Sequence, residues 1–311
     1  MKILLTGGAG FIGSHIARAL VERGDTVRVF DNFSSGKHAN LTGVAAETIE
    51  GDICDAQAVR RAASGMTHII HLAAMASVPR SVADPLGSNA VNVTGTLNVL
   101  CAARDLGLQR VVFASSSSIY GEAFAGPKHE DLPLYPLSPY GVAKLAAEKY
   151  CAAFHTVYGL ETVALRYFNV FGPRQDPNSE YAAVIPKFIT ALLAGRRPVI
   201  YGDGEQTRDF TYVANVVRGN LLALEAKGAA GRAFNVATGG AVSLNQLARS
   251  LADLVEQAVL PEYAAPRPGD IRHSSADITR AGEVLGFEPI VDFREGLRLT
   301  LDWYRNQLNA G

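Results

Sequence analysis

Nearly continuous apolar runs alternate with longer amphipathic stretches in the first half of the chain. The runs that we predict to be β-strands are Lys2–Thr6, Thr26–Phe30, Thr48–Glu50, Thr67–Leu72, Arg110–Ser115 and Thr162–Arg166. Uninterrupted apolar strands are typical of parallel sheets, because helices cover both faces of such sheets. The alternation with helical stretches predicts βαβ units, and therefore an α/β fold with a doubly wound parallel sheet.

The pattern becomes less regular after residue 168. Turn-forming residues separate shorter elements there, namely Gly172-Pro173, Gly202-Asp203-Gly204, Gly239-Gly240 and Pro266-Arg267-Pro268-Gly269. We predict two domains: residues 1–168, to which a segment near residues 210–237 returns, and a smaller mixed α/β lobe of residues 169–311 that binds the substrate. The turn-rich stretch Gly121–Pro139 is the candidate linker, and we expect it to cover the site.

Composition excludes several classes of protein. With 48% hydrophobic and 19% charged residues, the 311-residue chain is typical of a folded globular protein. Its formal net charge of −1 gives no basic field that would hold a nucleic acid. The sequence has no signal-peptide core and no apolar run of membrane length, so we expect a cytoplasmic protein. Its three cysteines are widely spaced and its seven histidines form no zinc pattern, so we expect neither a disulfide framework nor a metal site.

A glycine-rich loop directly follows the first predicted strand. Gly7, Gly10 and Gly13 open a helical pattern that runs from Ser14 to Glu22. Glycines in this setting allow a tight turn and let backbone N–H groups approach a pyrophosphate, as in Rossmann-type domains. A glycine triplet by itself would be weak evidence for a dinucleotide site, because ordinary turns also contain glycines. The loop therefore predicts a dinucleotide site only together with the strand before it and the helix after it.

Acidic residues end the next two predicted strands. Asp31 lies 18 residues after Gly13, where a carboxylate binds the adenosine ribose diol. A carboxylate there repels a 2′-phosphate, which favours NAD over NADP, although Arg28 and Lys37 lie nearby in the sequence. The alternative is that Asp31-Asn32 only ends the strand in a turn. Asp52-Ile53 either meets the adenine or forms a plain turn.

Serines and a Tyr-x-x-x-Lys pair predict the chemistry. The strand that begins at Arg110 runs into Ser115-Ser116-Ser117-Ser118, and ligands of open α/β sheets bind at the carboxyl ends of strands. Ser138 and Pro139 predict a helix start that places Tyr140 and Lys144 on one face. A free phenol has a pKa of about 10. The Lys144 ammonium, a positive nicotinamide ring and the helix start would lower that pKa, so that Tyr140 can act as an acid and base. A chance Tyr-x-x-x-Lys match is the alternative reading.

Taken together, these motifs resemble the extended short-chain dehydrogenase/reductase family, in particular its UDP-glucose 4-epimerase and UDP-N-acetylglucosamine 4-epimerase branch. The resemblance covers essentially the whole chain. The segments that carry it are TGGAGFIGSH, DNFSSG, HLAAMASVPRS, NVTGTLNVL, SSSSIYGE, SPYGVAK, LRYFNVFGPRQ, VIYGDGEQTRDF and RPGDIRHSSAD. The resemblance implies an NAD cofactor and a UDP-hexose substrate.

The resemblance also implies roles for individual residues. Ser116, with Ser117 as the fallback, would bond the sugar at the reacting carbon, Tyr140 would be the acid and base, and Lys144 would be its partner. The implied cofactor contacts are Gly7, Gly10, Phe11, Ile12, Gly13, Asp31, Asn32, Asp52, Ile53, Leu72, Ala73, Ala74, Asn92, Tyr140, Lys144 and Tyr167. The implied substrate contacts are Ser116, Ser117, Tyr140, Asn169, Val184, Tyr201, Arg208, Arg267, Asp270 and Ser274. Two arginines from separate loops suit a diphosphate.

Three departures from neighbouring branches narrow the expected reaction. Dehydratases and decarboxylases of the family tend to carry an acid where this chain has Ser117 and Ser118, which favours epimerisation. Asp176 stands where relatives acting on UDP-glucuronate tend to carry Arg, which favours neutral hexoses. Ser274 aligns with a bulky Tyr in epimerases restricted to unacetylated sugars, so the pocket would also have room for an N-acetyl group.

The expected reaction is therefore NAD-dependent interconversion of UDP-glucose and UDP-galactose through a 4-keto sugar, with N-acetylated substrates as a possible extension. The alternatives are a UDP-glucuronate 4-epimerase, another NAD-dependent nucleotide-sugar dehydratase or reductase, and a non-catalytic NAD-binding regulator. The family also implies a homodimer through two helices that begin near Asn89 and Pro139. The apolar residues that fit such an interface equally well fit core packing: Val93, Leu97, Leu100, Ala143 and Ala147.

Overall fold

A large twisted sheet forms the centre of the larger part of the molecule. The computed structural model describes residues 1–122, 124, 126–177, 183–256, 260–266 and 272–310. Within these residues the sheet has seven strands, all parallel, in the order β11-β6-β5-β4-β1-β2-β3. Their bounds are β1 (Lys2–Thr6), β2 (Thr26–Asp31), β3 (Glu47–Glu50), β4 (His68–His71), β5 (Arg110–Ser116), β6 (Glu161–Tyr167) and β11 (Arg232–Val236). The predicted doubly wound sheet is confirmed.

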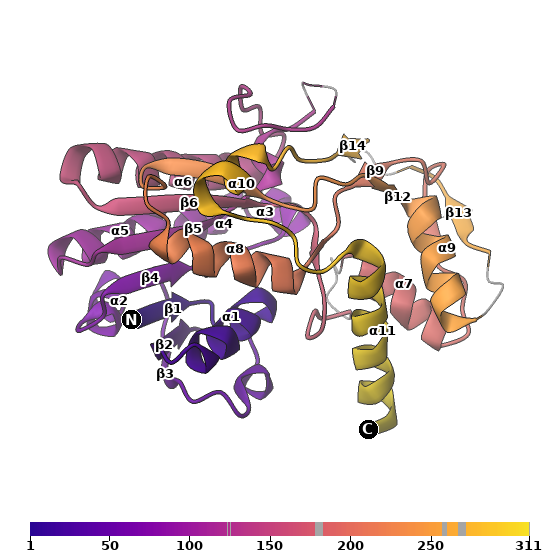
Figure 1. The fold of residues 1–311 in the computed structure, drawn as a ribbon, viewed down its shortest axis with the longest axis horizontal. Coiled ribbons are helices and arrows are strands. Elements are labelled where there is room, and N and C mark those ends of the chain that lie inside the picture. The colour runs from indigo at the N-terminus through magenta and orange to yellow at the C-terminus, as the bar shows by residue number, and fades with distance from the viewer. Residues whose placement is uncertain (123, 125, 178–182, 257–259, 267–271, 311) are drawn as a thin grey trace.

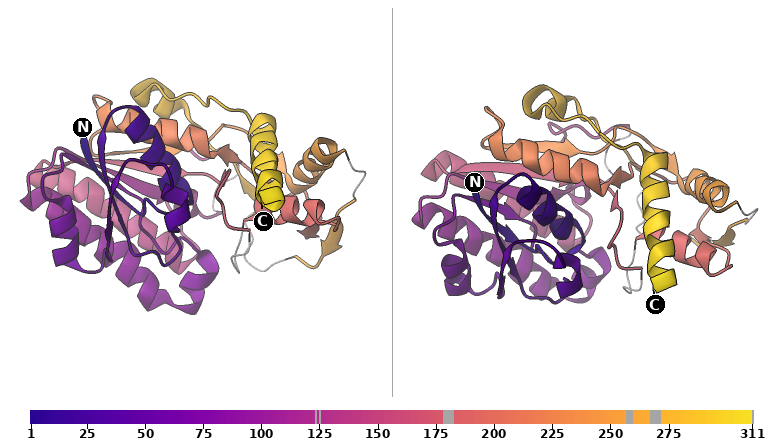
Figure 2. Two further views of the ribbon diagram at one scale, coloured as in Figure 1. Left: turned by 90° about the horizontal axis from the view of Figure 1, so that it is seen from below. Right: turned by 60° about the horizontal axis from the view of Figure 1, so that its bottom comes forward.

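Helices cover both faces of this sheet, as Figures 1 and 2 show. One buried apolar cluster joins the sheet to α1 (Phe11–Glu22), α8 (Val213–Glu225) and α10 (Thr279–Leu285). A second cluster on the other face joins it to α2 (Ala56–Ala63), α5 (Thr96–Asp105) and α6 (Pro139–Tyr158). Strand order reverses between β1 and β4, so the crevice outside their carboxyl ends is the place where such sheets bind ligands.

The sequence predicted the start of one helix correctly and placed the start of another too late. The Ser138 side chain accepts a hydrogen bond from Gly141 N, and α6 begins at Pro139 as predicted. The helix predicted to begin near Asn89 begins earlier, as α4 (Pro85–Asn89), because Asp84 caps it by accepting from Gly87 N. It follows α3 (Val78–Ala83) and continues into α5 through a π-helical segment, Ala90–Gly95. Such wide turns often occur at functional sites.

The remaining elements build a smaller mixed α/β lobe beside the large sheet. Its helices are α7 (Val184–Leu193), α9 (Leu244–Val255) and α11 (Phe293–Ala310). Its short strands are β7 (Val170–Phe171), β8 (Val199–Tyr201), β9 (Thr207–Arg208), β10 (Thr211–Tyr212), β12 (Val242–Ser243), β13 (Glu262–Ala264) and β14 (His273–Ser274). Phe171, Phe188 and Phe210 lie in the buried cluster of this lobe. The division into two domains at residue 168 stays a prediction.

Candidate active site

The glycine loop between β1 and α1 is closely packed against the end of β4. Gly7 has a φ of +71°, and a Cβ atom there would lie 2.7 Å from Ala73 N. A Cβ atom on Gly13 would lie 2.1 Å from Gly7 O, so only glycine fits both positions. The loop therefore leaves its backbone accessible to a bound dinucleotide and brings Leu72, Ala73 and Ala74 to the same crevice. Phe11 and Ile12 begin α1 and pack against the core of the smaller lobe.

The carboxylate that ends β2 organises the next part of the crevice. Asp31 is 7% exposed and accepts hydrogen bonds from Ala9 N and Phe33 N, each 2.9 Å long. Asn32 Nδ2 donates to Asp52 Oδ2 at 3.0 Å, which places the ends of β2 and β3 together. A hydrogen bond from Cys54 N holds the pKa of Asp52 below its usual value. Ile53 is buried behind it. The residues predicted to hold the adenosine are thus adjacent.

Both cations that made NADP an alternative have partners elsewhere. Arg28 Nε lies 2.7 Å from Glu47 Oε2, and its Nη1 donates to Ala62 O and Ser64 O. Lys37 Nζ lies 2.8 Å from Asp176 Oδ2. These contacts hold both side chains in positions where they do not point to a 2′-phosphate beside Asp31. The Asp31 carboxylate therefore still favours NAD over NADP.

A buried chain of hydrogen bonds connects the ends of β1 and β4 to the π-helical segment beside the crevice. Thr96 Oγ1 donates to Asn92 O, so it accepts from His71 Nε2, and His71 Nδ1 in turn accepts from Thr6 Oγ1 at 2.6 Å. Burial lowers the pKa of His71 to about 3, which keeps the ring neutral, as this arrangement requires. The Asn92 side chain exchanges hydrogen bonds with the backbone of Met75. Through these contacts Asn92 fixes the loop after β4.

Ser116 and Tyr140 meet at the carboxyl end of β5. The Ser116 side chain lies close enough to the Tyr140 hydroxyl to affect its pKa, and Ser118 Oγ donates to Ser116 Oγ at 2.9 Å. Tyr140 N donates to the buried Ser81 Oγ at 3.0 Å, which fixes the start of α6. Ser117, the fallback, is partly buried and begins a short 3-10 turn directly after the strand. The serine strand and the tyrosine helix are therefore brought together.

The predicted lowering of the tyrosine pKa by Lys144 does not occur among these side chains. Burial raises the pKa of Tyr140, and the nearby Ser116 side chain only partly opposes this. The Lys144 ammonium is directed to Ala114 O, 2.8 Å away, and lies over the Phe113 ring. Burial lowers the pKa of Lys144 itself to about 8. The two side chains share a helix face, as predicted, but desolvation dominates both pKa values.

Tyr167 and Asn169 connect the catalytic strand to the smaller lobe. Ser116 and Tyr167 are register partners of β5 and β6, and the Tyr167 hydroxyl is bonded to Asn220. Two residues later Asn169 has a φ of 28°, in the left-handed region that few residues other than glycine adopt. Such conformations cluster at functional sites. The chain therefore turns at Asn169 directly into the pocket of the smaller lobe.

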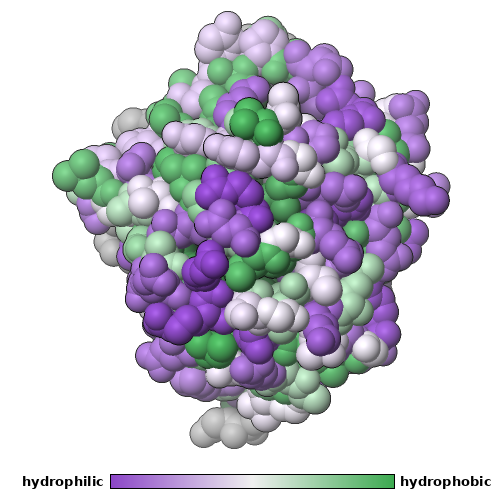
Figure 3. Space-filling model, turned by 90° about the vertical axis from the view of Figure 1, so that its left-hand side faces the viewer, coloured by the Kyte–Doolittle hydropathy of each residue, from purple (hydrophilic) through white to green (hydrophobic). Residues whose placement is uncertain are grey.

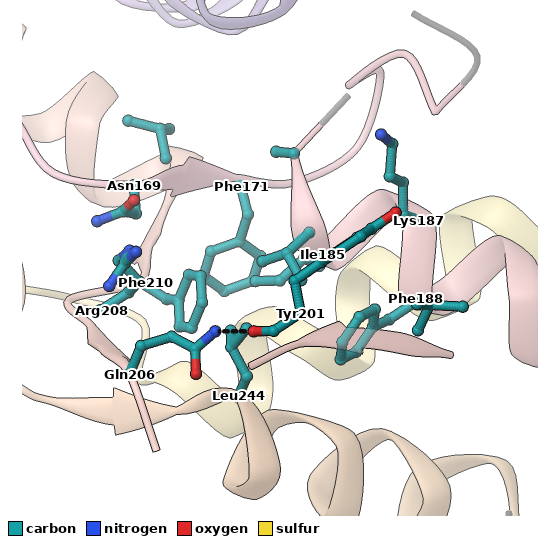
Figure 4. Close-up of a pocket in the computed structure, with 14 residues that line it drawn as sticks. Asn169, Phe171, Ile185, Lys187, Phe188, Tyr201, Gln206, Arg208, Phe210 and Leu244 are labelled. Carbon is teal, nitrogen blue, oxygen red and sulfur yellow. Dashed lines mark hydrogen bonds between the residues drawn. The ribbon is translucent and has the colours of Figure 1, made fainter. Parts of the chain in front are cut away.

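This pocket has a volume of about 300 Å³. Figure 4 shows Asn169 and Arg208 at one end and Lys187 at the other, with Phe171 and Phe210 between them. Four of the predicted substrate residues line it: Asn169, Val184, Tyr201 and Arg208. Gln206 and Lys187 also line it and were missed by sequence reasoning, although Gln206 lies within the VIYGDGEQTRDF segment. Gln206 Nε2 donates to Tyr201 O at 2.6 Å. Aromatic walls with few polar groups are typical of small-molecule sites.

Ser274 lies beside this pocket. It is the register partner of Arg208 between β14 and β9 and is partly buried. The buried Asp209 anchors the neighbouring backbone by accepting hydrogen bonds from Thr238 and Gly239. The strap from Gly121 to Pro139 lies against the same segment, since Lys128 N donates to Ser275 O. Arg267 and Asp270 lie outside the described residues.

A model of the NAD dependent epimerase/dehydratase family matches residues 3–237, which hold the glycine loop, Ser116, Tyr140 and Lys144. The chain belongs to this family. This epimerase/dehydratase family member therefore uses NAD, and the glycine cradle and Asp31 fit that cofactor.

Relatives of this epimerase/dehydratase family member place it in the nucleotide-sugar 4-epimerase branch, so it is an isomerase. It is 42% identical to the UDP-glucose 4-epimerase of Mycolicibacterium smegmatis over 99% of both chains. The crystal structure of the UDP-glucose 4-epimerase of Thermotoga maritima with UDP-glucose is 42% identical, with a TM-score of 0.95 over 99% of this chain and 100% of that one. The UDP-N-acetylglucosamine 4-epimerase of Methanobrevibacter ruminantium, in complex with UDP-N-acetylmuramic acid, is 44% identical, with a TM-score of 0.94 over 98% of both chains.

Among the described residues, no helix combines the length and apolar character needed to cross a bilayer. On the face seen in Figure 3, hydrophobic residues are interrupted by hydrophilic ones.

Proposed function

We propose that this enzyme interconverts UDP-glucose and UDP-galactose by inverting C4 of the hexose. The observation that carries the proposal is the close approach of the Ser116 and Tyr140 side chains at the end of β5, next to a strand that leads directly into the Arg208 pocket. The pair would face the sugar, and the pocket would hold the uridine diphosphate. The similarity to UDP-glucose 4-epimerases over nearly the whole chain supports this assignment.

In the proposed reaction, NAD held by the glycine loop and Asp31 would supply a hydride acceptor for C4 and a positive ring that favours the tyrosine phenolate, and the hydride would return to the opposite face of the 4-keto sugar. Tyr140 removes the proton of the C4 hydroxyl and later returns it. Ser116 orients that hydroxyl, and Lys144, held beside Ala114 O, supplies a cation next to the phenol. Arg208, with Arg267, binds the diphosphate, so that the sugar is free to rotate between the two transfers.

Several observations support a neutral sugar, with or without an N-acetyl group. Asp176 is a carboxylate and is paired with Lys37, so it offers no cation to a uronate. Ser117 and Ser118 provide no acid for elimination or decarboxylation. Ser274 is small and lies opposite Arg208, which leaves space beside the pocket. We therefore propose that UDP-N-acetylglucosamine is a second substrate.

The direct test is to incubate the purified enzyme separately with UDP-glucose, UDP-N-acetylglucosamine and UDP-glucuronate and to separate the products. We expect C4 epimers from the first two and no net change in NADH absorbance. A 4-keto-6-deoxy product, a decarboxylated product, stoichiometric NADH formation or epimerisation of the uronate alone would each contradict the proposal.

We also propose a homodimer formed through α4 and α6. Leu100, Ala143 and Ala147 cannot contribute to it, because they are buried in the core of this chain. The exposed apolar side chains near the start of α6, on α4 and on neighbouring α3 include Val82 (64%), Leu86 (83%) and Val142 (55%). Replacing Leu86 with Arg should convert the dimer to a monomer in sedimentation experiments. A wild-type protein that sediments as a monomer would contradict the proposal.

A further inference from the structure

One face of α6 carries Tyr140, Lys144 and Glu148 at intervals of four residues, so their side chains form a row along the helix. The last two are bonded to consecutive residues of β5. Lys144 Nζ donates to Ala114 O at 2.8 Å, and Glu148 Oε2 accepts from Ser115 Oγ at 2.6 Å. Ser116 is the next residue of that strand. Two polar bonds therefore join the helix to the strand directly behind the Ser116–Tyr140 pair.

Glu148 is itself held in one orientation. Arg166 donates to it from two nitrogens, Nη2 to Oε1 at 2.6 Å and Nε to Oε2 at 3.1 Å. This two-pronged geometry fixes a carboxylate more strictly than a single bond does. Arg166 is the register partner of Ser115 on β6, so the carboxylate lies over both strands. Glu148 is 5% exposed and Arg166 is 3% exposed, so little water competes for these bonds.

The other side of the guanidinium extends the network away from the helix. Arg166 Nη1 donates to the Tyr120 hydroxyl at 2.7 Å, and that hydroxyl donates to Asn235 Oδ1 at 2.7 Å. Asn235 lies on β11 and also binds Lys128 O and Asp277 O. The same side chains thus connect the catalytic helix to the strap and to the segment that follows Ser274.

We propose that Ser115, Glu148 and Arg166 are positioning residues for the reaction, which fix α6 against β5 and thereby keep the Tyr140 hydroxyl beside Ser116. The proposal rests on the roles assigned to Ser116 and Tyr140 in the proposed function. These residues are buried and bonded to one another behind the Ser116–Tyr140 pair. They act because reacting groups tolerate little displacement, and an error of 1 Å can lower a rate by about 100-fold.

The chain contains a matched control for this role. Thr162 Oγ1 donates to Cys151 O at 2.7 Å, and Thr162 is 1% exposed. This bond also joins a buried strand hydroxyl to α6, but three residues beyond Glu148 and therefore farther from Tyr140. A purely structural role predicts equal effects from removing either hydroxyl. A positioning role predicts an effect on catalysis only from Ser115.

The experiment compares Ser115→Ala with Thr162→Val. We expect Ser115→Ala to lower kcat for the UDP-hexose about 10- to 100-fold, with KM and NAD content within threefold of wild type. Thr162→Val should keep kcat within twofold at a similar loss of thermal stability. Equal kcat values for the two variants, or a change confined to KM, would overturn the proposal.

A second variant tests the ion pair. A single substitution would leave a buried charge without its partner, whereas replacing both residues with apolar ones of similar size is often tolerated. Glu148→Met combined with Arg166→Met should therefore fold and show the same selective loss of kcat. A folded double variant with wild-type kcat would overturn the role of the pair. If the double variant does not fold, the comparison of Ser115→Ala with Thr162→Val decides.

Crystal structures of the variants separate this proposal from the proposed function. We expect the contact between the Ser116 and Tyr140 side chains to be lost in Ser115→Ala and kept in Thr162→Val. That result would support positioning even if the wild-type enzyme failed to invert any UDP-hexose, which would refute the proposed function alone. An unchanged Ser116–Tyr140 contact in Ser115→Ala would overturn the positioning role alone.

Discussion

Replacing Tyr140 with Phe is expected to lower kcat by about 1,000-fold while NAD remains bound. The substitution removes the hydroxyl that Ser116 contacts and leaves the ring in its partly buried position, so the fold and the crevice keep their shape. Acid and base catalysis by a placed side chain is worth about 100- to 10,000-fold. The measurements are kcat for formation of the C4 epimer and the NAD released on denaturation.

Tyr150→Phe is the matched control for this variant. Tyr150 lies on the same helix, ten residues later, but is 40% exposed and faces away from the strand. It should retain wild-type turnover. Near-normal activity in Tyr140→Phe, or equal losses in both variants, would show that the phenol of Tyr140 is not the acid and base.

Replacing Ser274 with Tyr is expected to lower kcat/KM for UDP-N-acetylglucosamine about 100-fold and to change kcat/KM for UDP-glucose by less than about threefold. Ser274 lies opposite Arg208, so a large ring there would fill space at the edge of the pocket. Steric differences in a pocket are worth about 10- to 200-fold in discrimination. Competition between the two substrates in one reaction gives the ratio directly.

His273→Tyr serves as the control for that variant. His273 is the neighbouring residue of β14 and is exposed, and adjacent strand residues point in opposite directions. The ring that it introduces should leave both substrates unaffected. Similar losses for both substrates in Ser274→Tyr would mean that the residue contributes to nucleotide binding and not to the choice of sugar.

The large sheet could be predicted from the sequence because its strands are apolar on both sides. The predicted ends of β2 and β5 differ by one residue from those of the structure. The helix near Asn89 was placed too late, since its start depends on a local cap at Asp84 and not on apolar periodicity. From the sequence, Leu100, Ala143 and Ala147 fitted an interface and core packing equally well, and the structure buries them. Periodicity shows that a helix has an apolar side, but it does not distinguish a side that meets the sheet from one that meets solvent.

Long-range contacts account for what the sequence could not reveal at the site. Tyr140 and Lys144 were recognisable as a pair, but their pKa values depend on burial by distant segments. Gln206 and Lys187 carry no motif of their own, and they line the pocket only because separate elements converge there. Glu148 and Arg166 lie 18 residues apart and meet through the pairing of α6 with β6. Their partnership is a property of the folded chain.

β11 is the edge strand of the large sheet, beside β6. This strand comes after α7, α8 and most of the pocket residues in the chain, yet it pairs with β6 along five residues. A fragment that ends at residue 168 would therefore lack its outermost strand and expose the backbone donors and acceptors of β6. Open edges of that kind recruit other chains. The cofactor-binding half thus depends on the complete polypeptide to remain monodisperse.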